Sequence, residues 1–383
     1  MSIFLLVVFS IYSGMHIYLY WKIHQAFGGL GWWSGGAVLA FSVAMIFGLA
    51  GVRMLEHGGY PGIARISAAV AYPWMAVLFW LVCMFLLADA WNVGAYLVGF
   101  GWPAVRAAIL PARISLPIFC LASAVLLVWG IVEARLIRPV EVEIACPVLP
   151  AGSKPVIIAQ MTDLHLGING NSRRLVCAAE IVRKVQPDLI VFTGDLVDAP
   201  AKRLTHQAEI LNELHPPLGK YAVLGNHEFY SGLDNSIEFH RSAGLELLRQ
   251  RAVEVGEHLL VVGVDDSVGR RFSRRTQDDE LSALPDRRDG RFVILLKHKP
   301  DLTVESAGRF DLQLSGHTHG WQIFPFGLLC RFAFPNTPGL HRLDGGGWLY
   351  HSRGMGTWGP PLRLMSPPEV TVIRLVPPKS VTD

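Results

Sequence analysis

Residues 155–165 read PVIIAQMTDLH, and residues 187–198 read PDLIVFTGDLVD. Each stretch is a short apolar run rich in β-branched residues, with aspartate or histidine directly after it. Runs of this kind, bounded by Gly, Pro or Asp, are typical of buried β-strands. The intervening segment 172–185 has the apolar spacing of a helix. A strand, a helix and a second strand in this order indicate an α/β domain.

The same alternation continues toward the end of the chain. Helical patterns are expected at 202–214 and 236–243. Further strands are expected at 221–224, 253–256, 259–264, 292–296, 310–314, 348–352 and 370–375. We place this domain at residues 155–383, a reasonable length for one hydrophobic core.

The charged residues are distributed unevenly along the 383-residue chain. Only 17% of all residues are charged, below the roughly 25% of an average soluble domain. Residues 1–134 hold eight of the 65 charged side chains: Lys22, Arg53, Glu56, Arg65, Asp89, Arg106, Arg113 and Glu133. The remainder of the chain has an ordinary charge content. The sequence therefore consists of an apolar region followed by a polar domain.

The apolar region, 1–134, contains four runs long enough to cross a bilayer, which needs roughly 20 apolar residues in a helix. They lie near 2–21, 35–52, 66–88 and 114–132. The first lacks the basic start and the cleavage pattern of a signal peptide, so we expect a retained helix. Segment 91–110, rich in Gly and containing Pro103, predicts an interfacial or re-entrant stretch. Residues 135–154 predict a linker whose alternating VEVEI stretch can form a strand.

The basic residues beside these runs indicate an orientation. With four spans, Arg53, Arg65, Arg135 and Arg138 lie on the side of the polar domain, and Lys22, Arg106 and Arg113 lie on the other. This excess of four to three favours a cytoplasmic polar domain under the positive-inside rule. The chain is thus expected to be an integral protein of the inner or plasma membrane.

Net charge and cysteine content exclude several classes of protein. The chain has a net charge of +3 and no basic tail or arginine-rich helix, so nucleic acid is not an expected partner. Five scattered cysteines form neither a disulfide framework nor a zinc site of CxxC type. Oligomeric state is left open.

Polar residues gather directly after the predicted strands, where open α/β sheets place their ligands. Five groups occur in order: Asp163 and His165; Asp195 and Asp198 after Gly194; Asn226, His227 and Glu228 after Gly225; His298; and His317 and His319 in a GHTHG stretch. Carboxylate and imidazole together suit Mn, Fe or Zn better than Ca²⁺. A carboxylate flanked by histidines can also hold two ions about 3.5–4 Å apart. The pattern therefore predicts a metal centre.

This ordered set, D-x-H, G-D-x-x-D, G-N-H-E, H and G-H-T-H, resembles the calcineurin-like metallophosphoesterase superfamily. The likeness covers roughly residues 155–376, and the stretch SRGMGTWG at 352–359 looks like the membrane-associated YkuE-type branch. The resemblance implies a four-layer α/β/β/α sandwich, here preceded by a bundle of about four transmembrane helices.

The resemblance also implies a role for each motif residue. One metal would take Asp163, His165, Asp195 and His319, and the other would take Asp195, Asn226, His298 and His317, so that Asp195 bridges. A hydroxide between two divalent ions would attack phosphorus, with His227 as the catalytic residue beside it. Asp198 and Glu228 would either orient a histidine or cap a turn. Arg353 is a candidate for binding the substrate phosphate.

The expected function is a membrane-anchored dimetal phosphoesterase. Helices that confine the site to a membrane surface favour a lipid or lipid-linked substrate, cleaved at a phosphodiester or pyrophosphate bond. UDP-diacylglucosamine-type pyrophosphates and glycerophospholipids both fit this class. Soluble nucleotides, phosphoproteins, and a non-catalytic metal-bound membrane sensor remain the alternatives.

Overall fold

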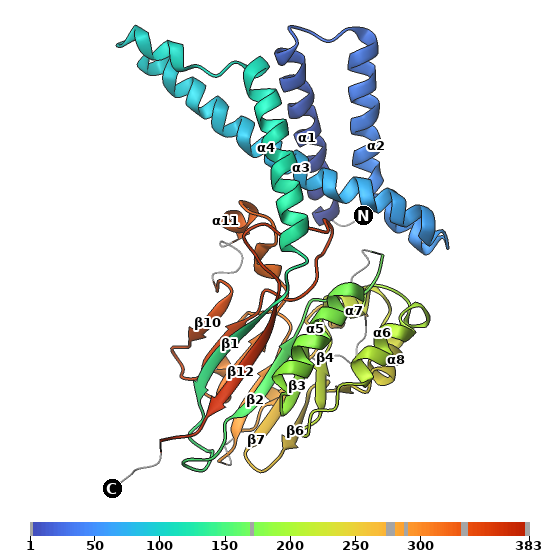
Figure 1. Ribbon diagram of the computed structural model, residues 1–383, viewed down its shortest axis with the longest axis vertical. Helices are drawn as coiled ribbons and strands as arrows, with labels where there is room; N and C mark the ends of the chain where they lie inside the picture. The colour runs from blue at the N-terminus through green and yellow to red at the C-terminus, as the bar shows by residue number, and fades with distance from the viewer. Residues whose placement is uncertain (1–2, 169–171, 273–279, 287–289, 331–335, 380–383) are drawn as a thin grey trace. The chain divides into compact units, whose positions relative to one another are not determined.

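The computed structural model describes residues 3–168, 172–272, 280–286, 290–330 and 336–379. The chain divides into two compact units (Figure 1). The first comprises Met1–Ile131 with Gly359–Leu362, and the second comprises Val132–Trp358 with Arg363–Asp383.

The first unit is helical, as the apolar runs predict. Its elements are α1 (Ile3–Ala26), α2 (Trp32–His57), α3 (Pro61–Val98), the 3₁₀ helix η1 (Pro103–Ala108) and α4 (Ala112–Glu133). Within the described residues, three helices are long and apolar enough to cross a membrane: Trp32–Glu56, Pro61–Val98 and Ala112–Glu133. The predicted span at 2–21 lies in α1, apart from residue 2, which is outside the described part, and α1 is not among these three.

Segment 91–110 differs from the sequence-based expectation. Its first eight residues continue α3 to Val98, so this part is a continuous helix and not a re-entrant stretch. The helix ends where Gly99, Gly101 and Pro103 follow closely, because glycine favours other conformations and proline cannot supply a backbone N–H. Only 103–108 forms the short η1 element.

The helices of the first unit pack on a small core and leave most apolar side chains outside. Tyr12 and Leu19 of α1 pack with Leu78, Leu81 and Phe85 of α3. On the outer surface, large apolar side chains such as Leu87 are more than two thirds exposed. A surface of this extent is unfavourable in water and suits the hydrocarbon core of a bilayer.

The second unit contains two six-stranded mixed sheets (Figure 1). The first has the order β1 (Arg138–Ala145), β12 (Glu369–Val376), β2 (Val156–Met161), β3 (Leu189–Thr193), β4 (Lys220–Val223) and β5 (Glu246–Leu247). The second has the order β10 (Gly339–Arg342), β11 (Trp348–His351), β9 (Leu312–Ser315), β8 (Phe292–Leu296), β7 (Leu259–Gly263) and β6 (Arg251–Val255). In the first sheet β2, β3, β4 and β5 run parallel, and β12 runs antiparallel to β2.

Alternate side chains of these strands enter different cores, which defines the layers. Ile158 and Val191 of the first sheet pack against Ile294 and Leu314 of the second. The opposite face of the first sheet, including Phe192, packs with α5 (Ser172–Val185), α6 (Thr205–Asn212) and α8 (Leu233–Ser242). The outer face of the second sheet is covered by α10 (Glu280–Ala283) and neighbouring loops. The expected four-layer α/β/β/α sandwich is therefore confirmed.

The remaining helical elements are short and follow strand ends. They are η2 (Ala201–Arg203), α7 (Asn226–Tyr230), α9 (Gly269–Phe272), η3 (Val304–Ser306), η4 (His319–Trp321) and α11 (Phe326–Cys330). The sheet also begins earlier than residue 155, because the VEVEI stretch of the expected linker forms β1 and pairs in parallel with β12. The sequence pattern did not predict β5 or β10.

Candidate metal centre

The predicted site residues lie at the carboxyl ends of strands from both sheets. Asp163 and His165 follow β2, Asp195 follows β3, Asn226 and His227 begin α7 after β4, His298 follows β8, and His317 and His319 follow β9. All are buried except His317, which is half-buried. Side chains separated by up to 156 positions in the chain thus share one small region.

Asp163, His165 and His319 form one group of candidate metal ligands. One potential ligand atom from each lies within 4.8 Å of the other two. His165 Nε2 is 3.0 Å from His319 Nε2, and His319 Nε2 is 3.7 Å from Asp163 Oδ1. Two ring nitrogens and a carboxylate oxygen therefore converge on one point.

Asp195, His298 and His317 form a second group that meets the same distance limit. His298 Nε2 is 3.1 Å from Asp195 Oδ2 and 3.1 Å from His317 Nδ1. The same Asp195 Oδ2 is 3.7 Å from His165 Nε2, a member of the first group. One carboxylate oxygen thus lies between the two groups.

Hydrogen bonds on the outer ring nitrogens orient the histidines. His298 Nδ1 donates to the carbonyl oxygen of Thr193 at 2.8 Å, which leaves Nε2 free of a proton on the neutral ring. His165 Nδ1 is 3.2 Å from Asp198 Oδ2, which favours the same tautomer. A nitrogen lone pair directed inward is what a metal ion needs, and such outer contacts are usual for metal-ligating histidines.

Asn226 provides an independent test of whether the site fits a metal ion. Its Oδ1 atom is buried and has no hydrogen-bond partner among the described residues. A buried carbonyl oxygen without a partner costs roughly 1–3 kcal/mol, so it normally has one. Together with the inward nitrogens and carboxylates, this oxygen matches the mixed N and O donor set of Mn, Fe or Zn.

The backbone at these residues is strained. Asp163, His165, Asp195, His317 and His319 all have positive φ angles, between 51° and 80°. Residues with a Cβ atom rarely adopt this region, and such strain persists only where the surrounding structure enforces it. The loops after β3 and β4 also approach each other closely, since a Cβ atom on Gly225 would lie 2.2 Å from Asp195 Oδ1. The clustering of strain points to a functional site.

His227 lies against the two groups with its own carboxylate partner. Its Nδ1 atom is 2.6 Å from Asp198 Oδ1, and it also forms a third close set with His165 and Asp195. Burial lowers the pKa of His227, but the negative charges of Asp195 and Asp198 outweigh this and raise that pKa to about 9. The Asp198 carboxylate therefore contacts both His165 and His227, as a residue that orients these rings would.

Glu228 holds the loop that carries Asp195. Its carboxylate accepts backbone N–H groups of Asp195 at 2.9 Å, Leu196 at 2.7 Å, Val197 at 3.1 Å and Gly225 at 2.7 Å. The side chain is fully buried. Sequence reasoning left histidine orientation and turn capping equally open for this residue, and the structure shows that Glu228 caps the turns at Asp195 and Gly225.

We expect Glu228→Gln to destabilise the protein by about 3 kcal/mol, because an amide cannot accept all four N–H groups and directs its own donors at them. Urea denaturation of the detergent-solubilised chain would measure the loss. The matched control is Glu213→Gln, an exposed glutamate paired with Arg183 at 2.8 Å, expected to change stability by less than about 1 kcal/mol. Equal stability of the two variants would contradict this role.

Arg353 is committed to a partner within the protein. Its Nη2 atom pairs with Glu369, a buried carboxylate, while its Nε atom is buried without a hydrogen-bond partner among the described residues. Its aliphatic part lies beside Gly320, next to His319. The position is close to the candidate ligands, but the guanidinium is already paired.

Arg363, which sequence reasoning missed, is the largest fully buried side chain among the described residues. Its guanidinium donates to the carbonyl oxygens of Gly356 at 2.6 Å and 2.8 Å, Ser366 at 3.1 Å and His319 at 3.2 Å. It thereby ties the loop after β9 to the segment before β12. No motif in the sequence marks this arginine, because its partners are backbone atoms.

Comparison with known proteins agrees with this geometry. The family described as calcineurin-like phosphoesterase matches residues 157–321, which include every motif residue from Asp163 to His319. An uncharacterized metallophosphoesterase of Aquifex aeolicus is 42% identical over 244 residues, covering 63% of this chain and 93% of that protein. The chain belongs to the calcineurin-like metallophosphoesterase family. It is therefore a metallophosphoesterase, an enzyme class that hydrolyses phosphate esters with divalent metal ions.

Two further relatives of this metallophosphoesterase are informative about its class. The YkuE metallophosphoesterase of Bacillus subtilis is 32% identical, covering 63% of this chain and 87% of that protein. A Danio rerio transmembrane protein with a metallophosphoesterase domain is 32% identical, covering 66% of this chain and 61% of that protein. The expected likeness to a membrane-associated branch is thus confirmed.

Proposed function

We propose that the metallophosphoesterase holds two divalent transition-metal ions, Mn, Fe or Zn, and uses them to hydrolyse a phosphodiester or pyrophosphate bond of a lipid or lipid-linked substrate. The observation that carries the dinuclear assignment is Asp195 Oδ2, which lies between the two groups of candidate ligands. The first ion would be held by Asp163, His165, Asp195 and His319, and the second by Asp195, Asn226, His298 and His317. When bound, the ions supply an activated water and neutralise phosphoryl oxygens.

His227 is the proposed proton donor. Asp198 occupies its Nδ1 atom, so the Nε2 atom is available to a substrate. In the metal-free protein the negative charges of Asp195 and Asp198 raise the pKa of His227 to about 9. A protonated imidazole here would donate a hydrogen bond to a phosphoryl oxygen or a proton to the leaving group.

Apolar side chains around His227 support a substrate with an apolar part. Trp358 and Tyr230 both contact His227 edge-on, with ring centroids 6.0 Å and 5.6 Å away, and Phe272 lies 6.0 Å from Tyr230. All three aromatic side chains are more than half exposed. Gln322 fixes the backbone of Trp358 through two hydrogen bonds, of 2.9 Å and 3.0 Å. We call Trp358, Tyr230 and Phe272 the aromatic rim.

The aromatic rim also favours one alternative, a soluble nucleotide, because an exposed ring can stack on a base. The apolar helices of the first unit distinguish the lipid substrate from the soluble nucleotide. Anchoring concentrates a site at the bilayer surface, which benefits hydrolysis of a membrane lipid and does nothing for a soluble nucleotide. We therefore rank the lipid substrate first.

Replacing Trp358 with alanine tests this choice. We expect KM for a lipid pyrophosphate in mixed micelles to rise about tenfold, the effect of losing roughly 1.4 kcal/mol of apolar contact. Hydrolysis of a small chromogenic diester should change less than twofold. A matched control is Trp348→Ala, whose ring packs on Arg342 in the second sheet. A loss confined to nucleotide hydrolysis would favour the soluble-nucleotide alternative. Equal changes on all substrates would show that the aromatic rim does not select the substrate.

The proposed location is the inner or plasma membrane, with the metal site on the cytoplasmic side. The support is the excess of basic residues flanking the helices on that side. Thiol labelling of single cysteines placed near Arg65 and near Arg106, in intact cells and in broken cells, would establish the orientation. Labelling of the cysteine near Arg65 in intact cells would show the opposite orientation, with the metal site outside the cytoplasm.

A further inference from the structure

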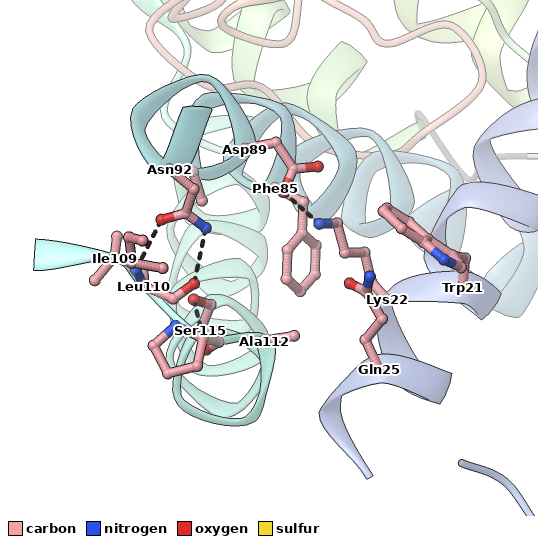
Figure 2. A pocket seen from close by; sticks show the side chains of 12 residues that line it. Trp21, Lys22, Gln25, Phe85, Asp89, Asn92, Ile109, Leu110, Ala112 and Ser115 are labelled. Atoms are coloured by element: carbon pink, nitrogen blue, oxygen red, sulfur yellow. Dashed lines mark hydrogen bonds and ion pairs between the residues drawn. The ribbon is translucent and has the colours of Figure 1, made fainter. Parts of the chain in front are cut away.

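The helical unit contains a cavity, lined by both polar and apolar side chains, at one end of its bundle. It has a volume of about 240 Å³ and lies between the last turns of α1, the second half of α3 and the start of α4 (Figure 2). At roughly 30 Å³ per water this space would hold on the order of eight waters, enough for a polar headgroup. The metal site does not require this cavity.

An ion pair between apolar helices lies in the wall of this cavity. Lys22 of α1 pairs with Asp89 of α3, and the two side chains are 5% and 33% exposed. The hydroxyl of Tyr18 donates to Asp89 Oδ2 at 2.6 Å. A buried pair of this kind is weak evidence for stability, because desolvation offsets the attraction, and ionisable groups inside a membrane bundle usually mark a binding or transport site.

Lys22 retains capacity to bind an anion. Within the described residues, Asp89 is its one hydrogen-bond acceptor, and its Nζ atom otherwise faces aromatic rings, with the centroid of Trp21 at 4.6 Å. A lysine ammonium has three donors, and two of them make no hydrogen bond to the described residues. The Asp89 side chain is 33% exposed, so part of its carboxylate is accessible as well.

Tryptophans place the cavity at the headgroup level of a bilayer. Trp21 and Trp91 lie in the last turns of α1 and α3, and Trp102 lies in the connection between α3 and η1. Their side chains are 48%, 56% and 67% exposed. Indole rings concentrate at the membrane–water interface, where phospholipid headgroups lie.

We propose that this cavity binds the headgroup of a zwitterionic aminophospholipid, with its phosphate at Lys22 and its ammonium at Asp89. The two protein charges are opposite and adjacent, as are those of phosphoethanolamine. The first turn of α4, which begins at Ala112, adds the partial positive charge of a 22-residue helix to the same wall. An anionic headgroup would satisfy Lys22 and leave Asp89 facing a negative charge. A choline headgroup would meet Asp89 without an N–H donor.

Native mass spectrometry of the full chain in detergent tests the proposal. The probe is an equimolar mixture of phosphatidylethanolamine, phosphatidylcholine and phosphatidylglycerol with identical acyl chains. We expect phosphatidylethanolamine adducts to exceed phosphatidylcholine adducts roughly tenfold. The double variant Lys22→Met with Asp89→Asn removes both charges together and should abolish this preference. Ala112→Phe, which fills the cavity without altering a charge, should do the same.

Controls separate this site from general lipid binding and from misfolding. The pair Arg53→Met with Glu56→Gln removes two other charges of the same unit and should keep the preference. Hydrolysis of a soluble chromogenic ester should be unchanged in all variants. If the double variant does not fold, the lipid preference of Ala112→Phe tests the proposal by itself. Equal adducts of the three lipids, excess phosphatidylglycerol, or a preference that survives Ala112→Phe would each overturn the proposal.

Discussion

Asp195→Asn should lose both metal ions and at least a thousandfold in kcat. The reason is geometric: Asp195 Oδ2 is 3.1 Å from His298 Nε2 and 3.7 Å from His165 Nε2, so one charged oxygen serves two groups of candidate ligands. An amide oxygen carries no net charge and cannot balance two divalent ions. Loss of that charge removes several kcal/mol of metal binding, and with it the activated water.

The variant Asp163→Asn tests the bridging role of Asp195 by comparison of metal content. Asp163 belongs to one group only, so its variant should retain close to one metal per chain while Asp195→Asn retains close to none. Asp286→Asn, at an exposed surface aspartate, is the control and should retain both. Metal content by inductively coupled plasma mass spectrometry gives the answer. Equal metal content in the Asp163 and Asp195 variants would show that Asp195 does not bridge.

His227→Ala should keep both metals and lose about 10²–10⁴ in turnover, the usual contribution of a positioned proton donor. The expectation follows from the Nδ1 contact with Asp198, which directs the opposite ring edge to the substrate. The loss should shrink for esters with acidic leaving groups such as nitrophenol, because these leave without a proton. Burst and steady-state kinetics on a series of leaving groups would measure this dependence.

Two outcomes would change the role of His227. Equal losses for good and poor leaving groups would indicate that the ring only positions the phosphoryl group. Loss of one metal in His227→Ala would make it a ligand, which its closeness to His165 and Asp195 permits. His206→Ala is the matched control, since that imidazole is 76% exposed and lies outside the site.

Much of the fold could be predicted from local patterns. Helix α5 and strand β8 have the predicted bounds, because short apolar runs between turn residues have few alternatives to a buried strand. Strand β10 was missed, because residues 339–342 of this half-exposed strand carry no apolar alternation. The helical form of segment 91–98 was not predicted, because glycine within an apolar helix is tolerated when neighbouring turns continue the hydrogen bonding.

The sequence by itself determined which side chains follow each strand and in what order, from Asp163 to His319. Those features are local, since each residue sits directly after an apolar run. The tertiary structure alone decided which distant groups meet: Glu228 on the Asp195 loop, Arg363 on the His319 carbonyl, and Lys22 beside Asp89. These contacts join residues 33 to 67 positions apart through backbone carbonyls, N–H groups or single charges. Such partners have no periodicity or spacing, so only the packing of helices and sheets brings them together.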